Sequence, residues 1–258
     1  MKRVPTLELL DTDAGTPAEV TASLVDLCMI NGWFGGVATT VELTRRIAHA
    51  RAGQQNTQRN QNNGALGVAA RPAFDKAAPP LSLSVLDVAS GSGFVPQAAR
   101  EKLARQGLHL EITLLDRIAS HFNGAANVRV SSNHRPRTVV ANALTLPFRD
   151  SSFDLISSVL FAHHLGPDEL VRFVNESLRV CRRAVLINDL IRDPIHLALV
   201  YSGFPLYRSR LTRNDAPASV RQAYTQDEMR DILSRTNAAR IEIDSRYLYR
   251  MGVIAWKE

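Results

Sequence analysis

Residues 85–96 read VLDVASGSGFVP. An apolar run that contains Asp87 passes directly into a turn with two glycines, and Pro96 follows where a helix would begin. A buried strand that ends in a glycine-rich turn and continues as a helix is typical of a doubly wound α/β sheet. Because ligands bind at the carboxyl ends of the strands in such a sheet, this stretch predicts the position of a binding site.

The alternation of strands and helices continues through the rest of the chain. Apolar segments predict strands at residues 84–89, 110–116, 138–143, 152–161, 184–190, 239–244 and 251–258. Helical patterns with starting or terminating residues lie at 96–106, 167–180 and 225–235. We therefore predict an α/β fold with a Rossmann-like, doubly wound and mostly parallel seven-stranded sheet, whose last two strands could form an antiparallel hairpin.

The N-terminal part of the chain differs in composition from the rest. Thr16 and Glu19 form a capping-box pattern that begins a helix, and the segment INGWFGG at 30–36 interrupts this helix. A tract rich in Gln and Asn follows at 53–64, and it lacks the apolar residues needed for a core. We expect a helical N-terminal arm or lid at 1–51, a flexible linker at 52–80, and the main domain at 81–258, with an irregular, aromatic-rich insertion at about 194–224 that would roof the substrate site.

Charge and cysteine usage exclude several classes of protein. The net charge is +6, but the basic residues are scattered, and the densest groups are pairs such as Arg45-Arg46, so a nucleic-acid partner is not expected. Cys28 and Cys181 lie far apart, which predicts neither a disulfide nor a metal site. The N-terminus lacks the features of a secretory signal, and no run approaches the roughly 18 apolar residues of a membrane span. We expect a cytoplasmic protein.

The acidic residues near the glycine turn indicate which cofactor binds there. A dinucleotide fingerprint would require Gly or Ala at the position of Pro96, and Asp87, four residues before Gly91, would repel a pyrophosphate. S-adenosylmethionine has no phosphate and carries a sulfonium and an ammonium, which a carboxylate attracts. Asp116 ends the second strand, where an acceptor for ribose hydroxyls is expected. The side-chain carbonyl of Asn142 could accept a hydrogen bond from the adenine amino group.

Several motifs together resemble the class I S-adenosylmethionine-dependent methyltransferases. The segments LDVASGSG, LLDR, NALTLPFRDSSFDLI and HHL, within about residues 82–190, are similar to the small-molecule branch with its ubiquinone/menaquinone-type enzymes. SLVDLCMINGWFGG, VLINDLIRDP and RNDAPASVRQAYTQDEM further resemble a bacterial subgroup associated with type III polyketide synthases. The resemblance implies that S-adenosylmethionine is the cofactor and that it transfers a methyl group to a small acceptor.

The resemblance also implies cofactor-binding residues. It places the methionine part and the nucleoside near Asp87, Gly91, Gly93, Asp116 and Asn142, and we expect Ala89, Ser90, Arg117, Ala143 and Leu160 to line the same site. The sequence departs from the family at Ala89, where Gly is common, and at Asn142, where Asp is common. Neither change should abolish binding, because Ala is small and Asn keeps an acceptor.

Two adjacent histidines are the candidates for catalysis. His163 and His164 follow the fourth strand, and a general base assists methyl transfer to a phenol or enol. Neighbouring side chains point in different directions, so we expect at most one of them, preferably His163, to face the substrate; the alternative is a structural loop histidine. Asp189 ends the fifth strand and would orient a histidine or accept a proton, unless it caps the next segment or pairs with Arg192.

Aromatic residues suggest a lid and a flat acceptor. Trp33 would either close over the sulfonium through a cation–π contact or act as a buried plug between helices. Tyr201, Phe204 and Tyr207 in the insertion would suit an aromatic or polyketide-like acceptor, although they could equally pack in the core. The leading prediction is O- or C-methylation of such a molecule. An RNA methyltransferase and a non-catalytic cofactor-binding protein remain as alternatives, and the sequence does not indicate an oligomeric state.

Overall fold

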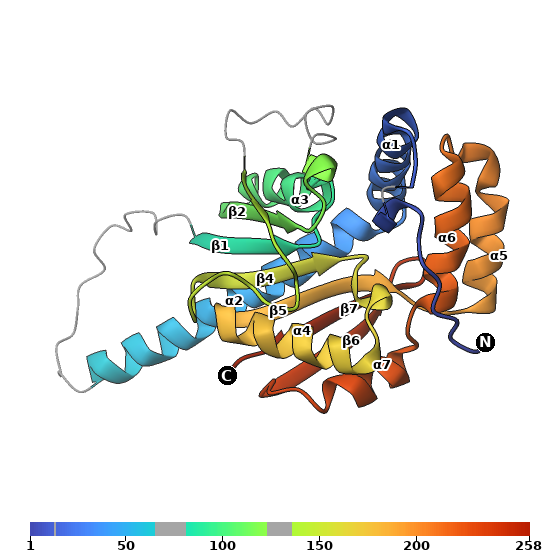
Figure 1. Cartoon of the computed structure of the whole chain (residues 1–258). Coiled ribbons are helices and arrows are strands. Elements are labelled where there is room, and N and C mark those ends of the chain that lie inside the picture. The colour runs from blue at the N-terminus through green and yellow to red at the C-terminus, as the bar shows by residue number, and fades with distance from the viewer. Residues whose placement is uncertain (13, 65–80, 123–135) are drawn as a thin grey trace.

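The central feature of the computed structural model is one seven-stranded sheet with the order β3-β2-β1-β4-β5-β7-β6 (Figure 1). The structure describes residues 1–12, 14–64, 81–122 and 136–258. The strands are β1 (Leu81–Val88), β2 (Leu108–Asp116), β3 (Arg137–Val140), β4 (Phe153–Val159), β5 (Cys181–Leu190), β6 (Arg240–Arg246) and β7 (Arg250–Trp256). The first five are parallel, whereas β7 runs antiparallel to both β5 and β6. The predicted fold class is confirmed, including the closing hairpin.

Helices cover both faces of this sheet. They are α1 (Pro17–Trp33), α2 (Gly36–Gly64), α3 (Phe94–Ala104), α4 (Pro167–Val180), α5 (Pro194–Ser202), α6 (Arg210–Gln222) and α7 (Gln226–Leu233). Leucine and isoleucine side chains of α2 and α3 pack on one face, and apolar side chains of α4 and α7 pack on the other. Helices α1, α6 and α5 lie side by side beyond the carboxyl ends of the parallel strands (Figure 1). They therefore cover the edge at which a ligand is expected.

Helix α2 is a layer of the domain, which corrects the prediction of a separate N-terminal arm. Leu43 and Ile47 of this helix are fully buried in one cluster with residues of the sheet. The Asn188 amide on β5 donates hydrogen bonds to the Gly36 carbonyl (2.7 Å) and the Thr40 hydroxyl (2.9 Å) at the start of α2. These contacts join segments that are distant in the sequence, so no local pattern could have revealed them.

The expected linker also begins later than predicted. Helix α2 continues to Gly64, so residues 52–64 of the predicted linker at 52–80 are helical, while residues 65–80 lie outside the described part of the chain. The Gln/Asn tract contains no proline. Because a helix that has already formed extends at little cost through residues such as Gln, Arg and Ala, low hydrophobicity alone did not end it.

The insertion at about 194–224 is helical and not irregular. Asp193 caps α5 by accepting from the backbone amides of Ile195 and His196, and Ser209 caps α6 in the same way. The sequence pattern hid these helices because α5 is apolar around most of its circumference and α6 contains Pro217 in its interior. Among the described residues no single helix has the length and apolar composition needed to cross a membrane, and α1 with residues 36–50 meets those criteria only as a pair bent by 58°.

Candidate cofactor and acceptor site

A cavity of about 520 Å³ lies at the carboxyl ends of β1, β2 and β4. Most of the predicted cofactor-binding residues line it. They are Asp87, Ala89, Ser90, Gly91, Asp116, Arg117, Asn142, Ala143 and Leu160. They meet because consecutive parallel strands end at the same edge of the sheet. Their predicted role in holding the cofactor therefore has a common geometric basis.

The turn after β1 requires unusual backbone angles. Gly91 and Gly93 have φ values of 52° and 69°, and Ala89 and Leu160 also adopt the left-handed conformation, with φ values of 55° and 57°. Such angles disfavour side chains with a Cβ atom. Glycine at position 89 would adopt this backbone conformation without strain, whereas Ala89 adopts it at an energetic cost.

Two predicted cofactor residues do not line the cavity. Gly93 packs against β2 instead: a Cβ atom there would lie 2.4 Å from the Leu114 Cδ1 atom. Trp33 is 67% exposed at the end of α1. The same helix turns Asn31 toward the cavity, and a residue two positions further lies about 200° around the helix. Trp33 is therefore not a buried plug between helices, and in this structure it lies outside the lining of the cavity.

Asp87 is a buried carboxyl group without a neutralising cation. It is 1% exposed, and its Oδ1 atom has no hydrogen-bond partner among the described residues. Burial raises the pKa of Asp87 to about 7, and the neighbouring carboxylate of Asp116 acts in the same direction. A cationic ligand group in this cavity would therefore gain a strong electrostatic partner and would favour ionisation of Asp87.

Asp116 and Asn142 hold the loops of the cavity together. The Oδ2 atom of Asp116 accepts from the backbone amide of Gly91 at 2.8 Å, and its Oδ1 atom accepts from the amide of Ile118 at 2.9 Å. The side-chain oxygen of Asn142 accepts from the backbone amide of Leu144 at 2.9 Å, which forms an Asx turn. This bond uses one of the two lone pairs of the Asn142 oxygen and leaves the second for the adenine amino group.

The N-terminal segment, residues 1–12, lines the cavity without having been predicted to do so, and it supplies Leu7, Glu8, Leu10 and Asp11. Arg3 anchors it by donating hydrogen bonds to the carbonyls of His163 (2.9 Å) and Leu165 (3.0 Å). The amides of Leu9 and Leu10 donate to the Asp215 carboxylate at 2.9 and 3.0 Å. Leucines and acidic residues alternate irregularly here, so no helical or strand pattern pointed to this segment.

The His163 side chain is buried between two carboxylates. Its Nδ1 atom lies 2.6 Å from the Asp189 Oδ1 atom, and its Nε2 atom lies 3.5 Å from the Glu8 Oε1 atom. Burial alone would lower the pKa of His163, but the carboxylates of Asp189 and Glu8 raise it well above its ordinary value. The Asp189 carboxylate contacts this ring, as expected of a residue that orients it, and the role of His163 as general base stays a prediction.

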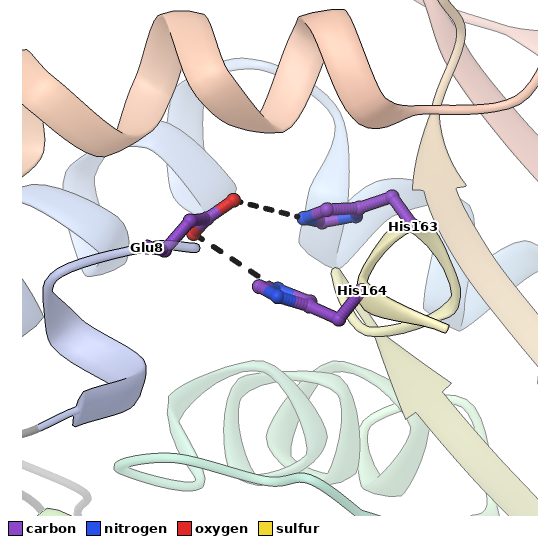
Figure 2. Close-up of side chains that lie close together, drawn as sticks. All are labelled: Glu8, His163 and His164. Atoms are coloured by element: carbon purple, nitrogen blue, oxygen red, sulfur yellow. Dashed lines mark ion pairs between the residues drawn. The ribbon is translucent and has the colours of Figure 1, made fainter. Parts of the chain in front are cut away.

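The His164 side chain reaches the same place. Its Nδ1 atom lies 2.8 Å from the Asp11 Oδ2 atom, and its Nε2 atom lies 3.9 Å from the Glu8 Oε2 atom. Figure 2 shows both imidazoles directed toward Glu8. Both histidines line the cavity, and which of them faces the acceptor stays a prediction. Both rings reach the cavity because of the short 3₁₀ turn, Ala162–His164, together with the position of Glu8 between them.

The predicted aromatic roof does not reach this cavity. Tyr201, Phe204 and Tyr207 pack against one another, with ring centroids 5.2 and 5.8 Å apart, and are not among its lining residues. Helix α6 contributes Ser219 instead, while α1 contributes Leu24, Leu27 and Cys28. Apolar surface in the cavity comes from α1, from the N-terminal segment and from Phe94 and Phe161, whereas Tyr207 is buried and Tyr201 is 43% exposed outside the cavity.

The sheet order, the glycine turn after β1 and the acid that ends β2 define a class I S-adenosylmethionine-dependent methyltransferase domain. Residues 86–187 match the family described as Methyltransferase domain, so this segment is a domain of that family. The class implies S-adenosyl-L-methionine as the cofactor.

Curated relatives match the same part of the chain. The Ubiquinone/menaquinone biosynthesis C-methyltransferase UbiE of Rickettsia typhi is 31% identical over 109 residues, which are 42% of each protein. The protein of the same name from Rickettsia felis is 30% identical over 114 residues, 43% of this chain and 44% of the relative. The chain thus matches less than half the length of these relatives, and the narrower likeness to the polyketide-synthase-associated subgroup stays a prediction.

Solved structures share the fold. A SAM-dependent methyltransferase from Aquifex aeolicus superimposes with a TM-score of 0.50 at 17% identity, over 70% of this chain and 85% of that one. An O-methyltransferase family 2 protein from Planctomyces limnophilus, in complex with apigenin, gives a TM-score of 0.51 at 16% identity, over 75% and 56% of the two chains. At these identities the likeness concerns the fold alone.

Proposed function

We propose that the chain is an enzyme that transfers the methyl group of S-adenosylmethionine to a small, apolar or aromatic acceptor, on oxygen or carbon. The observation that carries this proposal is the buried Asp87 carboxyl, which lacks a partner for its Oδ1 atom and lies in the cavity at the end of β1. A cofactor with two cationic groups and no phosphate fits such a carboxyl, whereas a pyrophosphate would be repelled by it.

The walls of the cavity support a small-molecule acceptor. The strand ends supply the acids Asp87 and Asp116, and leucines of α1 and the N-terminal segment supply apolar surface. Methyl transfer requires an in-line approach of the acceptor atom to the sulfonium methyl group, which an apolar wall can enforce by packing. The name of the Rickettsia relatives, which specifies C-methylation in quinone biosynthesis, supports a ring carbon as one candidate acceptor atom.

The charge around the cavity speaks against RNA as the acceptor. Its lining contains five acidic residues, Glu8, Asp11, Asp87, Asp116 and Glu169, against one arginine, Arg117, and three histidines, His121, His163 and His164. A phosphate backbone near this rim would meet mainly like charge, and the favourable phosphate contacts that dominate nucleic-acid binding would be lost.

The proposal is tested by incubating the protein with S-adenosylmethionine that carries a deuterated methyl group and a panel of phenols, quinols and pyrones. We expect mass spectrometry to detect one labelled methyl group on a member of this panel, with formation of S-adenosylhomocysteine. Labelling of RNA, with none of the small molecules labelled, would favour the nucleic-acid alternative. Cofactor binding without transfer to small molecules or RNA would favour a non-catalytic binding protein.

A further inference from the structure

Three potential metal ligands converge at the wall of the cavity. They are Glu8 from the N-terminal segment and His163 and His164 from the 3₁₀ turn after β4, and one ligand atom of each lies within 4.8 Å of the others. The Nε2 atom of His163 lies 3.5 Å from Glu8 Oε1, and the Nε2 atom of His164 lies 3.9 Å from Glu8 Oε2 (Figure 2). Two imidazoles and one carboxylate therefore face a common point.

The distances fit ligands around an ion better than direct hydrogen bonds. A charge-assisted hydrogen bond between an imidazole and a carboxylate would bring the heavy atoms to about 2.8 Å. Ligand atoms held about 2.1 Å from one ion in tetrahedral or octahedral geometry lie about 3.0–3.4 Å from each other. The observed separations of 3.5 and 3.9 Å require only small side-chain movements to reach this range.

The outer contacts of both histidines are those of metal-bound imidazoles. The Nδ1 atom of His163 lies 2.6 Å from Asp189 Oδ1, and that of His164 lies 2.8 Å from Asp11 Oδ2. A metal-ligating histidine commonly donates its other ring N–H to a carboxylate, which fixes the tautomer and frees the ligating nitrogen. Each ring is thus held so that its Nε2 atom is left for a ligand.

Glu8 is oriented in the same manner. Its Oε1 atom accepts hydrogen bonds from the Ser219 hydroxyl at 2.6 Å and the Gln222 amide at 2.7 Å. In addition, the His163 side chain is only 2% exposed, and its Nε2 atom has no hydrogen-bond partner among the described residues. A buried nitrogen without a partner is costly, and a bound ion would remove that cost.

We propose that Glu8, His163 and His164 bind a divalent first-row transition metal ion such as Zn²⁺. Two imidazoles and one carboxylate suit such ions, whereas Mg²⁺ and Ca²⁺ prefer oxygen ligands. Three protein ligands leave coordination positions open, and all three residues line the cavity. Given the proposed methyl transfer, an oxygen atom of the acceptor would occupy one of these positions. Cysteine spacing, on which the expectation of no metal rested, carried no information about this site.

The test is metal binding by the full chain, with any affinity tag removed and after dialysis against a chelator. Calorimetry with Zn²⁺ should give a one-to-one complex, and Co²⁺ should give visible absorption bands typical of nitrogen and oxygen ligands. Glu8→Gln and His164→Gln should each weaken Zn²⁺ binding by at least about tenfold. His109→Gln, which removes an exposed histidine on β2, is the matched control and should leave the affinity unchanged.

Asp11→Asn is a milder variant that leaves all three ligands in place. It should weaken Zn²⁺ binding by about 10–100-fold, because Asp11 contacts the Nδ1 atom of the His164 ring and so orients its Nε2 atom. Absence of a stoichiometric complex in the parent protein would overturn the proposal. So would equal Zn²⁺ affinity in the parent, Glu8→Gln and His164→Gln proteins, or a Co²⁺ spectrum unchanged by Asp11→Asn.

A separate variant distinguishes this proposal from the proposed function. Asp87→Asn should lose affinity for S-adenosylmethionine but keep the one-to-one Zn²⁺ complex, because Asp87 lies at the end of β1 and is not one of the three proposed metal ligands. Conversely, chelator-treated parent protein should still bind the cofactor. Failure of metal binding with intact cofactor binding would reject the metal site alone.

Discussion

The ionisation of Asp87 should make cofactor binding depend on pH. Burial raises the pKa of this carboxyl to about 7 in the ligand-free protein, and a cationic cofactor would favour its ionised form. Binding below pH 7 must therefore release a proton, so affinity should rise with pH and level off above pH 7. At pH 6 about one molecule in ten is ionised, which predicts about tenfold weaker binding than on the plateau, or about 1.4 kcal/mol.

Calorimetry in buffers of different ionisation enthalpy measures both the affinity and the number of protons released. We expect about half a proton released per cofactor at pH 7 and nearly none at about pH 8 or above. Asp87→Asn should abolish the pH dependence and lower the plateau affinity by roughly 10–100-fold, since it removes a hydrogen-bonding charge.

Glu169→Gln is the matched control for this experiment. Glu169 also lines the cavity, and Gln can replace it in the capping box at the start of α4. This variant should keep the parent slope of affinity against pH. A flat profile in the parent protein, or an unchanged slope in Asp87→Asn, would show that Asp87 ionisation does not control cofactor binding.

Three further substitutions and one stability measurement follow from the same geometry. Gly93→Ala should lower the unfolding free energy by about 2–4 kcal/mol, because its methyl group meets Leu114 and φ is 69°; a parent-like thermal melt would contradict this. Ala89→Gly should raise the unfolding free energy by up to about 1 kcal/mol in chemical denaturation, by relieving the positive φ, and a loss of stability would count against it. Trp33→Ala should leave cofactor affinity within about twofold in calorimetry, since the side chain is 67% exposed outside the cavity. A tenfold loss of affinity would show that Trp33 contacts the bound cofactor as a lid. Because the folded pKa of Asp87 exceeds its unfolded value, the ligand-free parent should lose up to about 4 kcal/mol between about pH 4 and pH 7 relative to Asp87→Asn, and parallel stability curves would exclude that linkage.

Local signals predicted much of the fold. Helix α4 has the predicted bounds, Pro167–Val180, because Gly166 and Pro167 mark its start and acidic residues fill its first turn. The capping boxes at Thr16 and Thr225 are both present. The grouping of Asp87 and Asp116 in the candidate cofactor site was also predictable. They lie at the ends of neighbouring parallel strands, which meet at one edge of the sheet.

Contacts between distant segments were not predictable in this way. Glu8 reaches His163 and His164 only because Arg3 and Asp215 anchor the N-terminal segment over the cavity. The burial of α2 likewise depends on strands far along the chain. Neither relation leaves a period or a motif in the sequence. The contact of Glu8 with His163 and His164, and the place of the N-terminal segment in the cavity, could therefore be seen only in the structure.

The buried Asp87 carboxyl suits the cavity to a cationic cofactor without phosphate groups. The most direct test is calorimetric titration of the parent protein with S-adenosylmethionine and, separately, with NAD at about pH 8, where Asp87 is ionised. We expect one-to-one binding of S-adenosylmethionine, with NAD at least roughly a hundredfold weaker because Asp87 repels its pyrophosphate. Equal or tighter binding of NAD would contradict this expectation.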